Sequence, residues 1–153
     1  MELKSTLTVF NESEIEAKPG YVKGMTVRRL LGSGQHQTER ITVNRATFEP
    51  GSVSPFHWHP IEVFYYVISG RAIVNDIEGN RQEVTAGSLL YAPPGIAGSH
   101  EWEVKERLQL LAVRATAERE KMIQFTVDKK SKESSITLKD LINVGGAQFK
   151  SFY

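Results

Sequence analysis

The sequence predicts an all-β protein, and three observations support this fold class. Between residues 20 and 130 the apolar segments are short and turn residues separate them, with no sustained helical periodicity. Some segments alternate apolar and polar residues, which is typical of a strand with one buried face. The 153 residues can form one domain with a sizeable core but not two ordinary ones. We therefore expect a single domain over residues 1–153.

The expected strands can be placed in order along the chain. N-terminal strands are expected within residues 5–35, and the core of the domain within residues 40–115. Glycine or proline turns separate the apolar segments, and Asp76 to Asn80 is typical of a hairpin turn. The apolar segments are 25–31, 41–48, 61–68, 71–77 and 108–113.

Two later segments show the clearest alternation. In the stretch that begins at His100, Trp102 shares the face of His100, and Glu101 and Glu103 are expected to face water. In residues 123–127 apolar side chains occupy every second position. Each stretch therefore predicts a strand with one buried face.

The C-terminal tail, residues 128–153, has a different character. It begins with a polar linker, after which Thr137 and Asp140 resemble a capping box that predicts a short C-terminal helix. Gly145 and the glycine after it would end that helix. Three aromatic residues follow, and we expect them to cover a sheet in a homodimer.

Composition and charge exclude several classes of function. Nineteen basic and eighteen acidic residues leave a net charge of +1, which gives no footprint for nucleic acid or an anionic membrane. The absence of cysteine excludes disulfides, thiolate metal sites and cysteine nucleophiles. No apolar run could span a bilayer, and the first residues do not resemble a signal peptide. A cytoplasmic protein with a small-molecule ligand is expected.

The four histidines contain the clearest signal for chemistry. His57 and His59 form a His-x-His pair, and on a strand such residues point to the same side. Two imidazoles at this spacing can converge on one metal ion. His100, on the buried face of its strand, is the natural third ligand. His36 lies in a polar loop and is expected to be solvated.

Two stretches resemble the motifs of the cupin superfamily. Residues 51–70, GSVSPFHWHPIEVFYYVISG, are similar to the first motif through both glycines and the His-x-His pair. Residues 87–100, GSLLYAPPGIAGSH, are similar to the second motif through Gly87, Pro93 and Gly95. The resemblance implies a double-stranded β-helix, or jelly-roll barrel, that holds a divalent metal ion.

The chain departs from both motifs at ligand positions. The glutamate of the first motif falls on Val63, with Glu62 one residue earlier, and such a shift moves a side chain to the opposite face of a strand. The histidine of the second motif falls on Gly98, and His100 lies two residues later, which keeps the strand phase. Two sites therefore remain open: the three histidines alone, or the three with Glu62 brought in by a bulge.

These features favour a small metal-dependent enzyme acting on a small polar or carbonyl-containing molecule, with a dioxygenase-, lyase- or isomerase-like reaction. The candidate ions are iron, zinc, manganese and nickel, and three neutral ligands would favour an anionic or enolate-like substrate. The strand phase suggests the pocket walls Tyr65, Val63, Trp102 and Leu110. The alternative is a non-catalytic module that binds a small ligand, because the sequence offers no clear general acid or base.

Overall fold

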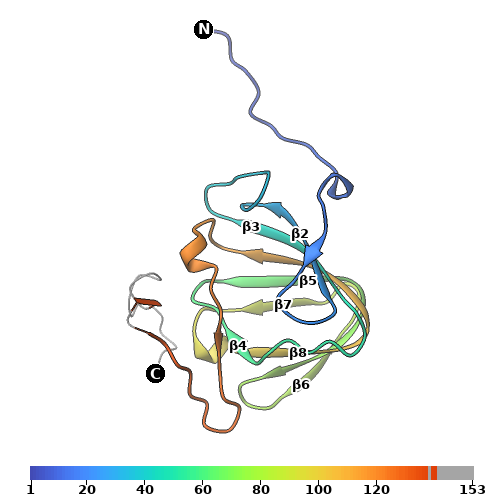
Figure 1. Cartoon of the computed structure of the whole chain (residues 1–153), viewed down its shortest axis with the longest axis vertical. Coiled ribbons are helices and arrows are strands. Elements are labelled where there is room, and N and C mark those ends of the chain that lie inside the picture. The colour runs from blue at the N-terminus through green and yellow to red at the C-terminus, as the bar shows by residue number, and fades with distance from the viewer. Residues whose placement is uncertain (138, 141–153) are drawn as a thin grey trace.

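The structure is a computed structural model that describes residues 1–137 and 139–140, and most of its regular elements are strands (Figure 1). In chain order the elements are η1 (Glu12–Glu14), β1 (Lys18–Pro19), β2 (Met25–Leu31), β3 (Thr42–Phe48), β4 (His57–Trp58), β5 (Val63–Asp76), β6 (Arg81–Val84), β7 (Leu89–Ala92), η2 (Ile96–Gly98), β8 (His100–Arg114), η3 (Arg119–Lys121) and β9 (Phe125–Thr126).

The two longest strands, β5 and β8, organise the fold. They pair antiparallel along nearly their whole length, from Val63 opposite Arg114 to Asp76 opposite His100. The register shifts several times between residues 67 and 72, and such irregularities bend a strand pair. Each of the two strands therefore contributes its two halves to different parts of the sheet.

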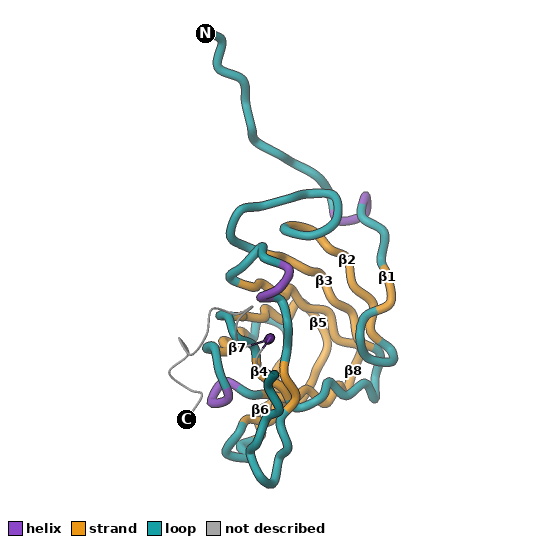
Figure 2. Tube along the Cα trace, turned by 60° about the vertical axis from the view of Figure 1, so that its left-hand side comes forward, coloured by secondary structure: helices purple, strands orange, loops and turns teal. Residues whose placement is uncertain are grey.

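All strand pairs are antiparallel. On one side of the bend the order is β1-β2-β3-β8-β5-β7, and on the other side β6, β5, β8, β4 and β9 are neighbours. The sheet curls around a common interior, as Figure 2 shows from a second direction. This architecture confirms the all-β prediction.

Gly70 makes the bend possible. Its φ of 91° lies in the left-handed region, where glycine is favoured over other residues. A Cβ atom at this position would lie 2.0 Å from the carbonyl oxygen of Arg107 on β8. The close approach of β5 and β8 at the corner thus requires a residue without a side chain.

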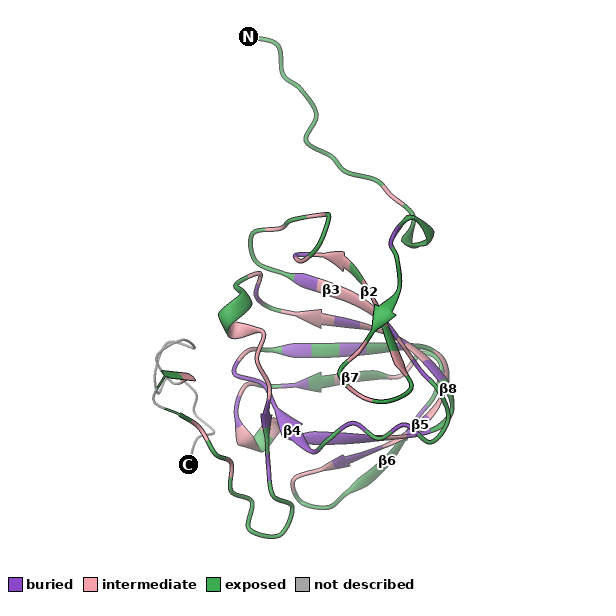
Figure 3. Ribbon diagram, viewed as in Figure 1, coloured by how far each residue is buried: buried purple, intermediate pink, exposed green. Residues whose placement is uncertain are grey.

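The inward faces of the strands form the main core (Figure 3). Along β5, Val63, Tyr65 and Val67 are buried, whereas Phe64 and Tyr66 between them are exposed, as expected from strand alternation. The other buried members of this core are Ala46, Phe48, Ala72, Val74, Val84, Trp102, Val104, Leu108, Leu110 and Ala112.

A second apolar cluster holds β4 against β9. The rings of Trp58 and Phe125 stack with centroids 4.6 Å apart, and Phe56 and Val127 are buried beside them. The Trp58 indole N–H donates a hydrogen bond of 3.0 Å to the hydroxyl of Ser134. The polar linker after β9 therefore helps to fix β4.

The two ends of the chain differ from the core. Residues 1–9 are exposed and run away from the sheet (Figure 1), and within residues 5–35 the strands are β1 and β2. The Asp140 backbone N–H donates to the Thr137 hydroxyl at 3.1 Å, as in a capping box. The expected C-terminal helix and terminal aromatics otherwise fall on residues outside those described. Among the described residues, no helix has the length and apolar character needed to cross a membrane.

Candidate functional site

Three histidines meet inside the curled sheet. His57 on β4 and His100 at the start of β8 are direct partners in the strand pairing, so their side chains share a face. His59 lies two residues after His57. The ring centroids are 4.6 Å apart for His57 and His100, 4.9 Å for His57 and His59, and 5.8 Å for His59 and His100. All three side chains are at most 3% exposed.

Backbone carbonyl groups orient these rings. The Nδ1–H group of His100 donates to the Gly98 carbonyl at 3.0 Å, and that of His57 donates to the Pro55 carbonyl. In both rings the proton is then on Nδ1, so Nε2 carries a lone pair that can bind a metal ion or accept a hydrogen bond. The buried Nδ1 of His59 has no hydrogen-bond partner of ordinary geometry among the described residues.

His57, His59 and His100 are electrically neutral at neutral pH. Burial lowers the pKa of His57 and His59 and lowers that of His100 to about 3. A neutral imidazole is the form that binds a metal ion. One ligand atom from each residue lies within 4.8 Å of the other two, and the buried Nε2 of His57 has no hydrogen-bond partner among the described residues. This donor set fits a divalent transition-metal ion, and the hydrogen bonds from Nδ1 of His57 and His100 to backbone carbonyls would hold these two rings in the orientation for binding it.

Tyr65 is the polar group that lies against these rings. Its hydroxyl oxygen is 3.3 Å from Nε2 of His59 and 3.4 Å from Nε2 of His100. Burial raises the pKa of Tyr65, so the phenol keeps its proton at physiological pH. Tyr65 comes from the inward face of β5, as its strand phase predicts.

The structure places Glu62 apart from the histidines. Glu62 is exposed, is not in the group of candidate ligands, and accepts a hydrogen bond from Tyr91 on β7. β5 begins at Val63 with its inward side chain, so Glu62, one residue earlier, has the opposite phase. No bulge brings its carboxylate inward.

Gly98 explains why the third histidine is displaced from the expected motif position. A Cβ atom on Gly98 would lie 2.2 Å from the carbonyl oxygen of Pro93. A histidine cannot occupy this position without moving the loop. Gly98 ends the short helix η2, whereas His100 begins strand β8, where its side chain faces His57.

A cavity of about 230 Å³ opens beside the histidines, which is a size that suits a small molecule. Three of the expected wall residues line it: Tyr65, Trp102 and Leu110. The fourth, Val63, does not line the cavity, because its side chain is packed among the apolar core residues at 1% exposure. His57 and Tyr65 lie where the histidine group meets the cavity.

The polar side of this cavity was not predicted from the sequence. Arg114, Arg29, Lys18 and Asn44 line it. A signal for Arg114 was present, because it follows the buried residues 108, 110 and 112 with the same period of two. The other three could not be assigned without knowing how β1, β2 and β3 pair.

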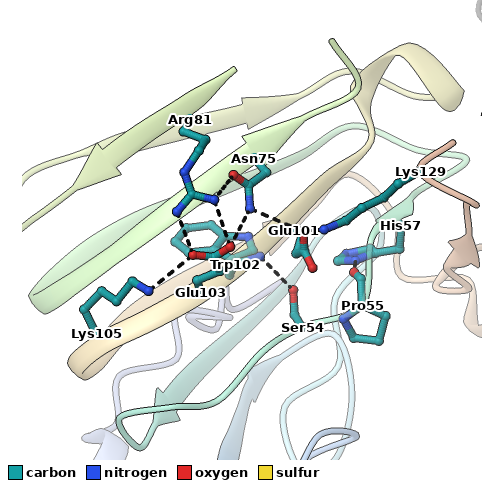
Figure 4. A network of polar contacts seen from close by, with 10 residues as sticks. All are labelled: Ser54, Pro55, His57, Asn75, Arg81, Glu101, Trp102, Glu103, Lys105 and Lys129. Carbon is teal, nitrogen blue, oxygen red and sulfur yellow. Dashed lines mark hydrogen bonds and ion pairs between the residues drawn. The ribbon is translucent and has the colours of Figure 1, made fainter. Parts of the chain in front are cut away.

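A separate polar network lies on the other face of β8 (Figure 4). Glu101 is only 8% exposed and is ion-paired with Lys129, which corrects the expectation that it faces water. The linker after β9 brings Lys129 over this face, which local alternation cannot reveal. Glu103 binds Arg81 at 2.9 Å, and hydrogen bonds from Arg81, Asn75 and Lys105 together lower the pKa of Glu103 to about 2. The side chains of Glu101 and Glu103 thus lie on the face of β8 opposite to that of His100.

Comparisons with known proteins agree with this architecture. A family model described as Cupin domain matches residues 44–114. The polyketide cyclase RemF from Streptomyces resistomycificus superposes with a TM-score of 0.64 at 20% identity, over 71% of this chain and 79% of that chain. An RmlC-like cupin from Shewanella frigidimarina NCIMB 400 has a TM-score of 0.59 at 20% identity, over 80% and 100%.

An enzyme of greater length is also similar. A mutant of oxalate decarboxylase from Bacillus subtilis has a TM-score of 0.61 at 22% identity, over 80% of this chain. The match spans only 33% of the decarboxylase, so this chain corresponds to about a third of it. No curated protein matches the chain. Structural likeness at these identities shows the fold.

Proposed function

The chain belongs to the cupin superfamily, and from this premise we propose that it is a metal-dependent enzyme acting on a small carbonyl-containing molecule. The observation that supports the proposal is the group of three buried, neutral imidazoles at the edge of a cavity. His57, His59 and His100 would hold the ion. Glu62 is not part of the proposed site.

The chemistry divides between the ion and the protein. When bound, a divalent ion at the three histidines would polarise a substrate oxygen as a Lewis acid. Tyr65 would hold a proton at its hydroxyl oxygen and donate it, or a hydrogen bond, to that oxygen. Trp102 and Leu110 present apolar surface to the cavity and would keep water away from the reacting group.

Tyr65 also separates this proposal from the non-catalytic alternative. The described cavity lining contains no aspartate or glutamate, and of its two tyrosines, Tyr21 and Tyr65, it is Tyr65 whose hydroxyl lies beside the histidines. Tyr65 is therefore the acid–base group that we propose for turnover. A binding module would need only the shape of the cavity and the ion. The Tyr65→Phe variant removes the hydroxyl and keeps the ring that packs against Trp102.

Metal analysis of protein purified anaerobically, without a metal-affinity column, tests the first part of the proposal. We expect about one divalent ion per chain, as one three-histidine site requires. Nuclear magnetic resonance then follows a panel of small 2-oxo acids, aldehydes and ketones mixed with the metal-loaded protein. Consumption of one compound by the wild type, and a roughly 100-fold slower rate with Tyr65→Phe, would support an enzyme. Saturable binding without consumption would support the binding module instead.

A further inference from the structure

The cavity next to the histidines carries an unbalanced positive charge. Lys18, Arg29 and Arg114 line it, and no aspartate or glutamate is present in its described lining. The protein as a whole has a net charge of only +1, so these cations are concentrated at one place. A pocket lined by charges of one sign attracts ligands of the opposite sign.

The strand register brings the polar residues of the cavity together. Arg29 on β2 is the direct partner of Asn44 on β3. Asn44 is paired with Ala112 on β8, and Arg114 is two residues farther along that strand on the same face. Diagonal neighbours of this kind lie about 7–8 Å apart, within reach of long side chains. Three adjacent strands thus direct two guanidinium groups and an amide into one space.

These cavity groups have unused hydrogen-bonding capacity. Within the described chain, the buried Nε of Arg114 and the buried Oδ1 of Asn44 have no hydrogen-bond partner. Other arginines have acidic partners: Arg71 is bonded to Glu106 and Arg107 to Glu49. A buried N–H group without an acceptor is costly, and an anionic ligand would supply the acceptor that the Arg114 Nε–H group lacks.

We propose that this cavity binds the carboxylate group of a small organic acid, with Arg114 as its principal anchor and with Arg29 and Lys18 at the opening. Arg114 is partly buried, whereas Arg29 and Lys18 are exposed, so the positive charge extends from the solvent to the interior. The opposite end of the acid would reach His57 and Tyr65. This inference rests on the proposed function, because it names the substrate class of the same site.

The rest of the lining favours a carboxylate over a phosphate. The planar guanidinium fork of one arginine matches the two oxygens of a carboxylate. Most of the remaining wall is apolar, which suits the carbon skeleton of an organic acid and not free phosphate. The apolar members of the lining are Pro19, Met25, Val27, Ala46, Phe48, Trp102, Leu110 and Ala112.

Calorimetric titration of the purified protein tests the inference without a known reaction. The probes are pyruvate, 2-oxobutanoate and 4-methyl-2-oxopentanoate, each compared with its neutral amide and with inorganic phosphate. We expect at least one acid to bind wild type more tightly than its amide, by roughly 10- to 100-fold. In Arg114→Gln this preference should disappear, and Arg114→Lys should keep only part of it because lysine cannot make the bidentate contact.

Two controls keep the result interpretable. Arg107→Gln removes an exposed arginine from the same strand and should leave the preference unchanged. If Arg114→Gln does not fold, Arg29→Gln should still weaken acid binding several-fold, because its charge acts at the opening. Equal binding of acid and amide, unchanged binding in folded Arg114→Gln, tighter binding of phosphate, or no binding of any acid would overturn the inference.

Metal content separates failure of this inference from failure of the proposed function. Arg114→Gln should retain its ion, whereas His100→Ala should lose it. Wild type without metal that still prefers acids over amides would contradict the metal-dependent enzyme and leave the carboxylate site standing. Wild type that binds metal but does not prefer acids over amides would contradict the carboxylate site and leave the metal-dependent enzyme standing.

Discussion

His57 and His100 lie opposite each other in the antiparallel pairing of β4 and β8, with their ring centroids 4.6 Å apart. Because the two residues come from distant parts of the sequence, the histidine group depends on strand pairing and not on the conformation of one loop. His59 joins them from the end of β4. The ligand geometry is therefore set by the pairing of the strands. Substitution of one histidine should leave the other two in place.

Removal of one histidine should empty the proposed metal site. His57→Ala, His59→Ala and His100→Ala should each lose most of the bound metal, because two ligands hold a divalent ion weakly. Metal stoichiometry measures the loss, and circular dichroism checks that the sheet persists. His36→Ala is the matched control, since His36 stacks on Phe10 in the N-terminal region and should keep the full metal content. A His100→Ala protein with full metal would contradict the site.

Neutralisation of Glu62 should leave metal binding unchanged. The side chain is exposed and bonded to Tyr91, so Glu62→Gln removes a charge on the outside of the sheet. We expect the metal content and the metal affinity of this variant to equal those of wild type, as measured by competition with a chelator. Loss of metal comparable to that of a histidine variant would show that a rearranged Glu62 coordinates the ion.

The outer face of β5 and β7 predicts a homodimer. Phe64, Tyr66 and Ile68 on β5 are 38–42% exposed, and Leu89 and Tyr91 on the adjacent β7 are more than half exposed. An exposed apolar face of this kind is typical of a contact surface. Sedimentation velocity at micromolar concentration should show a dimer for wild type and a monomer for Tyr66→Glu.

The matched control for the dimer is Gln82→Glu, which adds the same charge at an exposed position of β6. It should sediment like wild type. Monomeric wild type would refute the homodimer, and a dimeric Tyr66→Glu protein would place the interface elsewhere.

The corner at Gly70 should tolerate substitution less well than an open turn. Gly79→Ala puts a side chain at a φ of 88° where no atom lies within 4 Å, so it should cost about 1–2 kcal/mol of unfolding free energy. Gly70→Ala adds to such strain a contact of 2.0 Å with the Arg107 carbonyl oxygen. Urea denaturation should show a clearly larger loss for Gly70→Ala. Equal losses would mean that the corner relaxes freely.

The Glu103 network predicts a dependence of stability on pH. Hydrogen bonds from Arg81, Asn75 and Lys105, the first of them the strongest, lower the pKa of Glu103 from 4.5 to about 2. A carboxylate with a lowered folded-state pKa stabilises the protein above its unfolded-state pKa, and this contribution is lost as the pH falls toward 2. Wild type should therefore be more stable than Glu103→Gln at neutral pH, and the difference should shrink in acid.

Thermal unfolding at a series of pH values measures this difference. High salt should also reduce it at neutral pH, because Arg81 and Glu103 are accessible to solvent ions. A gap between wild type and Glu103→Gln that stays constant into acid would contradict the assignment.

The alternation of apolar and polar residues along the sequence predicted more of the fold than of the site. Alternation is encoded within each strand, so the all-β class and the inward phase of His100 could be deduced from neighbouring residues. The His57 and His59 pair was visible for the same reason. The burial of Glu101 could not be deduced, because Lys129 reaches it from a distant segment. The grouping of Arg29 with Arg114 likewise depends on the register of three strands, which the sequence pattern does not specify.

The position of β4 has a consequence for the order in which the protein matures during translation. This strand of two residues has β8 on one side and β9 on the other, with Trp58 opposite Phe125. A chain emerging from the ribosome exposes His57 and His59 long before β9 has been synthesised. Until residues 125–127 join the sheet, one edge of β4 has no hydrogen-bonded neighbour among the described strands. The histidine group therefore gains its final support late in synthesis, although two of its members emerge early.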